Sequence, residues 1–330
     1  MKKKLLITGA TGFLGYHLIE EAHKSGYDIY AGIRFGSKAD HLSPFNIKYL
    51  PLTYDNIDVL TKELERIQVN YIIHAAGSTK AKNEKVYNLI NATYSQNLAQ
   101  AANKANIDLK KFIFISSLAA VGPENNINGG AIEETLKPMP VTAYGKSKLL
   151  AENFLTEIKE LPLIIFRPTA IYGQREKDIF IMLKSIASGI EAYIGNKEQK
   201  LSFVYAKDMA EIGIRSLSTS ICNEVYHVSD GNVYGRYELA EITKTIIGNK
   251  TLKLHLPLGL VKTIASALDL VYIFSDKTPL LNRGKLNELT AVNWHCSIGK
   301  IQNELGFTPK YDLKQGLEET IKWYKTNNWL

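Results

Sequence analysis

The chain has few cysteines, no uninterrupted long apolar run and no block of like charge. Cys222 and Cys296 stand alone, without the spacing of a disulfide framework or a metal site. We therefore expect reduced thiols, no bound metal and a cytoplasmic location. The longest apolar stretch, 256–274, contains a proline and two charged residues, so no transmembrane segment is expected. The apolar run after Met1 is too short for a signal peptide.

Charge is mixed and scattered along the sequence. There are 40 Lys and Arg residues against 33 Asp and Glu, which gives a formal net charge of +7. Because no basic block is interleaved with aromatics, the surplus suits anionic small ligands and does not indicate nucleic-acid binding. At 330 residues and 45% apolar composition, with no linker and no repeat, the chain fits one large domain or two closely joined ones.

A glycine-rich turn follows the first apolar run. Residues 4–8 have the continuous apolar pattern of a buried parallel strand, and a helical pattern begins after Gly15. In this context glycines permit a tight turn, a close approach to a pyrophosphate and close helix packing. A tight strand–helix turn without a ligand is the alternative. The predicted dinucleotide contacts in this turn are Gly9, Thr11, Gly12, Phe13, Leu14 and Gly15.

A second strand, 28–33, ends at Arg34, which Ser37 and Lys38 follow. At this position of a dinucleotide site an acidic residue accepts a hydrogen bond from the ribose 2′-hydroxyl, whereas arginine suits a 2′-phosphate. The sequence therefore favours NADP, bound by Arg34 and Lys38, with NAD as second choice. The alternative is that Arg34 only caps a surface loop.

Apolar strand patterns alternate with helical patterns through most of the chain, which predicts an α/β fold with a doubly wound parallel sheet. We expect a Rossmann domain over 1–172 and a smaller, mainly substrate-binding lobe over 173–330, with segments of about 202–248 returning to the sheet. Right-handed crossovers place all the strand carboxyl ends at one edge. That edge collects Gly9, Arg34, Gly77, Ser117 and Pro168.

A candidate catalytic pair opens the helix predicted from Ala143. Tyr144 and Lys148 are four residues apart and so share one helix face. An ammonium beside a phenol lowers the phenol pKa, which suits proton transfer to or from a carbonyl or alcohol. Ser117, at the end of the 111–115 strand, is placed to orient the same substrate oxygen, with Ser116 as its competitor. The alternative is an exposed aromatic and a solvated lysine on a surface helix.

Taken together, these segments resemble the extended short-chain dehydrogenase/reductases, also called the NAD-dependent epimerase/dehydratase family. The resemblance covers nearly the whole length. It implies that Ser117, Tyr144 and Lys148 are the catalytic residues, supported by Asn91, and that the protein is a homodimer formed through helices 84–105 and 143–160. It also implies nucleotide or nicotinamide contacts at Leu52, Thr53, Ala75, Ala76, Gly77, Ser116, Tyr144, Lys148, Pro168 and Ile171.

Two departures from the family pattern bear on function. Leu52 and Thr53 stand where an acidic residue usually contacts the adenine, and Ala170 stands where sugar-nucleotide enzymes carry an asparagine. With the apolar stretch 256–274 and the tail 279–307, these features resemble the 3β-hydroxysteroid dehydrogenase and dihydroflavonol reductase branch. They predict an oxidoreductase that transfers a hydride between NAD(P) and a secondary alcohol or ketone with an apolar part. The alternatives are a nucleoside-diphosphate-sugar epimerase or dehydratase with bound NAD, and a non-catalytic NADP-sensing protein on the same fold.

Overall fold

A computed structural model describes residues 2–272 and 283–330. Its centre is a seven-stranded sheet in the order β11-β6-β5-β4-β1-β2-β3, and every neighbouring pair is parallel. This confirms the predicted α/β fold with a doubly wound parallel sheet. The strands are β1 Lys4–Thr8, β2 Asp28–Ile33, β3 Lys48–Pro51, β4 Tyr71–His74, β5 Lys111–Ile115, β6 Leu163–Pro168 and β11 Glu224–Val228.

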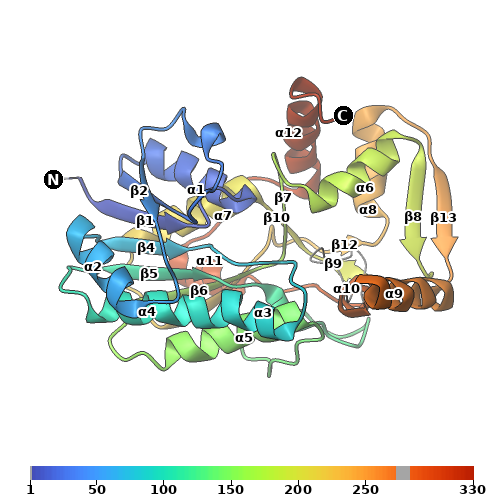
Figure 1. The fold of residues 1–330 in the computed structure, drawn as a ribbon. Helices are drawn as coiled ribbons and strands as arrows, with labels where there is room; N and C mark the ends of the chain where they lie inside the picture. Colours follow the sequence, from blue (N-terminus) through green and yellow to red (C-terminus); the bar gives the residue numbers. More distant parts are fainter. Residues whose placement is uncertain (1, 273–282) are drawn as a thin grey trace.

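Helices cover both faces of the sheet (Figure 1). Successive side chains of a strand point to opposite faces, so Leu5 and Ile7 join the apolar core under one helix layer and Leu6 joins the other. The first layer contains α1 Phe13–Lys24, α7 Ala206–Arg215 and α11 Gly299–Leu305. The second contains α2 Ile57–Ile67, α4 Tyr94–Lys104 and α5 Ala143–Thr156.

The helix predicted over 84–105 is continuous but not regular. It consists of α3 Glu84–Asn88, a π-helical turn at Leu89–Thr93, and α4. Alternation of apolar residues does not reveal a π-turn, because only one extra residue is accommodated in the helix. Such turns occur frequently at functional sites, and this one contains Asn91.

A smaller lobe extends beyond the sheet and has its own apolar core, which includes Tyr172, Tyr205, Leu317 and Tyr324. One later strand, β11, belongs to the main sheet. The lobe contains the short strands β7 Ala170–Tyr172, β8 Ile190–Ile194, β9 Lys200–Leu201, β10 Phe203–Tyr205, β12 Tyr234–Gly235 and β13 Leu252–Leu256. Its helices are α6 Asp178–Ala187, α8 Glu238–Ile247, α9 Leu258–Tyr272, α10 Arg283–Thr290 and α12 Leu313–Thr326.

Two features of this lobe differ from the sequence prediction. The sequence pattern over 201–205 predicts one strand, but the strand is divided at Ser202, whose hydroxyl donates to the Asn232 carbonyl, and its halves pair with β12 and β7. The parallel pair β8–β13 was not predicted, although Leu252–Leu256 alternates strictly. Residues 273–274 of the apolar stretch and 279–282 of the tail lie outside the described residues. Every helix in the described part is too short or too polar to traverse a bilayer.

Candidate active site

The glycine turn lies directly against the end of β4. Gly9 has φ +68°, and a side chain there would place Cβ 2.7 Å from the Ala75 carbonyl oxygen and the Ala76 nitrogen. A Cβ at Gly15 would lie 2.1 Å from the Gly9 carbonyl oxygen, so α1 starts in contact with the turn. Gly12 caps α1 without a side-chain hydrogen bond, which leaves first-turn N–H groups free for an anion. Thr11, Phe13 and Leu14 are partly buried around this helix start.

The residues predicted to bind the adenosine end of the cofactor differ in their exposure to solvent. Arg34 and Lys38 are exposed beyond β2, Thr53 is exposed, and Leu52 is buried, so the Leu52 side chain belongs to the core under the sheet. Tyr54 also lies in this region, and the sequence analysis did not name it as a candidate site residue. Its side chain is buried, and burial raises its pKa above the usual range, partly offset by Thr8 and Arg34.

A chain of buried polar groups connects the glycine strand with the helix that carries Asn91. Thr8 Oγ1 lies 2.6 Å from His74 Nδ1, and His74 Nε2 lies 2.9 Å from Ser95 Oγ. Ser95 in turn donates to the Asn91 carbonyl at 2.7 Å. Burial lowers the pKa of His74 to about 3, so the imidazole is neutral and acts as a fixed donor–acceptor bridge. The Thr8 hydroxyl also accepts from Ala76 N–H, which fixes the turn after β4.

Asn91 holds two segments of the site together. Its Oδ1 accepts from Ser78 N–H at 2.7 Å, and its Nδ2 donates to the Ser78 carbonyl at 3.0 Å and to Ser147 Oγ at 2.9 Å. A Cβ at Gly77 would lie 3.0 Å from Asn91 Oδ1 and 3.4 Å from Lys148 Nζ. The turn after β4, the π-turn and α5 therefore meet at one point.

Tyr144 and Ser117 are brought together at the carboxyl end of β5. Ser117 Oγ accepts from Ala119 N–H at 3.1 Å, and a Cβ at Gly145 would lie 2.2 Å from the Ala119 carbonyl oxygen, so the start of α5 packs directly on the turn that follows Ser117. Burial raises the pKa of Tyr144 to about 12, Ser117 opposes the rise, and Glu288 and Tyr87 add to it. The expected lowering of this pKa by Lys148 is therefore wrong, because desolvation dominates and Lys148 is not among the groups that shift the phenol.

Lys148 is buried with its ammonium directed at the sheet. Its Nζ donates to the Ile115 carbonyl at 2.8 Å and lies 4.7 Å above the Phe114 ring. Burial lowers the pKa of Lys148 to about 8, and Glu152 partly opposes this shift. The lysine is therefore poised to change protonation near neutral pH.

The competitor Ser116 has a different environment. Its hydroxyl donates to Glu152, whose carboxylate also pairs with Arg167 through Nε at 3.1 Å and Nη2 at 2.6 Å. All three side chains are buried. The Ser116 hydroxyl is thus engaged in a buried hydrogen bond to Glu152, whereas Ser117 faces Tyr144. Pro168, at the end of β6, and Ile171, in β7, follow Arg167 along the same edge.

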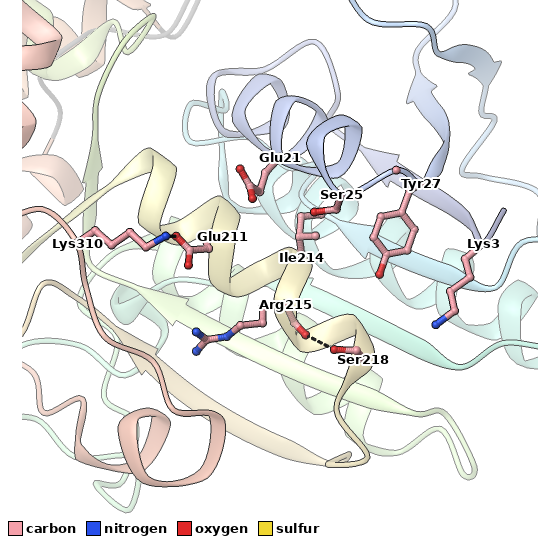
Figure 2. Close-up of a pocket in the computed structure, with 10 residues that line it drawn as sticks. Lys3, Glu21, Ser25, Tyr27, Glu211, Ile214, Arg215, Ser218 and Lys310 are labelled. Atoms are coloured by element: carbon pink, nitrogen blue, oxygen red, sulfur yellow. Dashed lines mark hydrogen bonds and ion pairs between the residues drawn. The ribbon is translucent and has the colours of Figure 1, made fainter.

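A shallow pocket of about 510 Å³ lies elsewhere, between the end of α1, the start of β2 and α7 (Figure 2). It is lined by Lys3, Tyr27, Arg215 and the Glu211–Lys310 ion pair, whose atoms are 2.6 Å apart. Lys3 and Tyr27 precede β1 and β2, so this pocket is at the amino end of the sheet. It contains none of the predicted site residues and is not the candidate site.

Fold and site together define a nucleotide-dependent enzyme built on a doubly wound parallel sheet. The NAD dependent epimerase/dehydratase family model matches residues 5–229, and the chain belongs to this family of enzymes. This confirms the resemblance drawn from the sequence and removes the non-catalytic alternative.

Relatives in this family differ in their chemistry. The chain is 25% identical to a decarboxylating sterol-4-alpha-carboxylate 3-dehydrogenase of Dictyostelium discoideum, over 96% of this chain and 99% of the relative. It is 26% identical to a putative UDP-glucose 4-epimerase of Methanocaldococcus jannaschii, over 98% and 99%. The structure of UDP-glucuronic acid 4-epimerase from Bacillus cereus in complex with NAD has a TM-score of 0.77, with 22% identity and coverage of 98% and 99%.

Proposed function

We propose that the protein is an oxidoreductase that interconverts a secondary alcohol and a ketone. The observation that carries the proposal is the close packing of the start of α5, which contains Tyr144, on the turn that begins at Ser117, with the buried Lys148 one helical turn further along α5. Tyr144 would donate or accept the substrate proton, and Ser117 would orient the substrate oxygen. Lys148 would supply positive charge next to the phenol, and Asn91 would hold Gly77 and α5 around it.

The residues present fit a dinucleotide. The turn at Gly9 and Gly15 has no room for a Cβ, and α1 starts without a side-chain cap. These features suit a pyrophosphate at the helix start. When bound, the nicotinamide supplies the hydride. Ala75, Ala76, Gly77, Pro168 and Ile171 would line its position at the sheet edge, and Arg34 with Lys38 favours NADP over NAD.

The substrate we propose is uncharged and partly apolar. Glu288 from α10 acts electrostatically on both Tyr144 and Tyr87, which disfavours an anionic group beside the phenol. Ala170 stands in place of the asparagine of sugar-nucleotide enzymes, which also favours a substrate other than a sugar nucleotide. The similarity to a sterol dehydrogenase agrees with such a substrate.

Epimerisation of a nucleotide sugar with bound NAD is the second candidate, because the chain is equally similar to a putative UDP-glucose 4-epimerase. This chemistry would use the same Tyr144 and Lys148. It is distinguished by a product that forms from a nucleotide sugar with no net change in cofactor absorbance. A homodimer through α3–α4 and α5, and a cytoplasmic location consistent with two unpaired cysteines, are further parts of the proposal.

Tyr144→Phe tests the mechanism. Loss of the phenolic proton should lower kcat by about 10²- to 10⁴-fold, while the Kd for the cofactor changes little. Tyr87→Phe is the matched control, since its ring lies 6.3 Å from Tyr144 and its hydroxyl donates to the Thr79 carbonyl. A Tyr144→Phe enzyme that retains most of its activity would exclude this mechanism for either candidate reaction.

A further inference from the structure

The two-stranded ribbon β8–β13 has one face composed only of apolar side chains. In its parallel register Ile190 lies beside Leu252, Ala192 beside Leu254 and Ile194 beside Leu256. These residues alternate along each strand, so they project from the same face. The exposed fractions are 44% for Ile190, 64% for Leu252 and 38–39% for Leu254 and Leu256. An apolar cluster of this kind on a folded chain commonly marks an interaction surface.

The opposite face of the ribbon is anchored to the lobe. Glu191 is buried and accepts an ion pair from Lys244 of α8 at 2.7 Å. The Tyr193 ring packs edge-on against Tyr237 with centroids 4.8 Å apart, and His255 stacks on Tyr193 at 5.6 Å. The apolar face is therefore held outward by contacts on the other side, and its exposure is a consequence of the fold.

Helix α9 continues this surface. It follows β13 after Pro257, and its Leu260 and Ile264 are 54% and 46% exposed. They are four residues apart and so lie on one helix face, while Val261 and Ala265 are buried. In Figure 1 the ribbon forms the edge of the small lobe and α9 lies across its end. We call Ile190, Ala192, Leu252, Leu254, Leu256, Leu260 and Ile264 the lobe face.

The charge around the lobe face is net positive. Lys244 pairs with Glu191 and Glu241, and Lys253 pairs with Glu241. No acidic residue occurs between Glu241 and Asp269, whereas that interval contains Lys244, Lys250, Lys253 and Lys262. Lys250 and Lys262 are exposed. Apolar side chains flanked by the exposed Lys250 and Lys262 match the interface of an anionic bilayer, where cations near the surface strengthen binding. Two copies joined through this face would instead bring their lysines together, which is unfavourable.

We propose that the lobe face docks on the surface of an anionic lipid bilayer. The apolar side chains enter the boundary between headgroups and acyl chains, and the exposed Lys250 and Lys262 contact lipid phosphates. Helix α9 packs on α10, which carries Glu288 close to Tyr144. Docking therefore brings the entrance of the candidate site near the lipid, a consequence that rests on the proposed function. The docking itself does not depend on any reaction.

Vesicle sedimentation with the full chain tests the docking. The protein should pellet with phosphatidylcholine vesicles that contain phosphatidylglycerol, and less with phosphatidylcholine alone or at high salt. The double variant Leu254→Gln, Leu260→Gln should bind the anionic vesicles on the order of tenfold less tightly, because two apolar side chains that would enter the bilayer are lost. Val59→Gln, which removes a 43% exposed apolar side chain from α2, should bind like the unmodified protein.

Three results would overturn the proposal. The first is that the protein does not pellet with either kind of vesicle. The second is that the double variant, with an unchanged Tm, binds as tightly as the unmodified protein. The third is a dimer in light scattering that the double variant dissociates, which would assign the lobe face to a second copy. Tyr144→Phe should bind vesicles normally, so loss of activity and loss of docking are separable.

Discussion

Asn91 Nδ2 donates to Ser147 Oγ at 2.9 Å, and Ser147 Oγ donates to the Tyr144 carbonyl at 2.7 Å. The π-turn before α4 is thereby joined to the first turn of α5, which carries the candidate catalytic phenol. The same asparagine binds both backbone groups of Ser78. One buried amide thus sets the spacing between the turn after β4 and the helix that carries Tyr144 and Lys148.

Asn91→Ala should therefore affect both stability and activity. Removal of the amide leaves Ser78 N–H and its carbonyl without their partner, which costs about 1–3 kcal/mol of unfolding free energy. Urea denaturation measures this loss, and kcat should fall more than the cofactor Kd rises. Asn103→Ala is the control, since Asn103 is exposed on α4. Equal stability of the two variants would show that the Asn91 network is dispensable.

Lys148 gives a pH-dependent contribution to stability. Burial lowers its folded-state pKa from 10.5 to about 8, so the unfolded state binds the proton more tightly. The resulting destabilisation is fully present below pH 8 and is relieved as pH rises towards 10.5. Its full size is on the order of 3 kcal/mol.

Lys148→Met removes this titration. Relative to the variant, the unmodified protein should gain unfolding free energy between pH 8 and 10.5, as measured by urea denaturation at several pH values. A constant difference across that range would mean that Lys148 is not desolvated. Activity should be lost at every pH, because the positive charge that the proposed mechanism takes from Lys148 is gone.

Breaking the buried pair Glu152–Arg167 should lower the free energy of unfolding strongly, whereas replacing both partners by apolar residues should lower it little. Its side chains are 4% and 8% exposed, so Glu152→Gln leaves an uncompensated guanidinium and should cost about 3–5 kcal/mol in urea denaturation. Glu152→Leu with Arg167→Met should recover most of this loss. Asp58→Asn, which breaks the exposed pair with Lys104, should change stability little. A similar loss for both single variants would contradict the role of burial.

Arg34→Asp tests the cofactor assignment. Loss of a charge-assisted hydrogen bond to a 2′-phosphate, and its replacement by an acceptor for the 2′-hydroxyl, should shift the NADP/NAD ratio of kcat/KM by on the order of tenfold or more towards NAD. Arg66→Asp, on the exposed face of α2, should leave the ratio unchanged. An unaltered ratio in Arg34→Asp would exclude a phosphate contact at this residue.

The features that could be predicted from the sequence are those that short sequence patterns determine. Continuous apolar strands such as 111–115, the glycine spacing from Gly9 to Gly15 and the interval from Tyr144 to Lys148 predicted the sheet, its ligand edge and the shared helix face. These properties depend on backbone geometry over a few residues. The family was recognisable from the same short segments because their order along the chain is specific.

Tertiary structure decided what depends on residues distant in sequence. Tyr54 meets Thr8, and Glu152 occupies Ser116 and thereby leaves Ser117 to face Tyr144. Burial reverses the expected shift of the Tyr144 pKa, because desolvation is set by everything packed around the phenol. The chain by itself determined which strands, turns and helices form. Only their packing decided which polar groups lose water and which hydrogen bonds replace it.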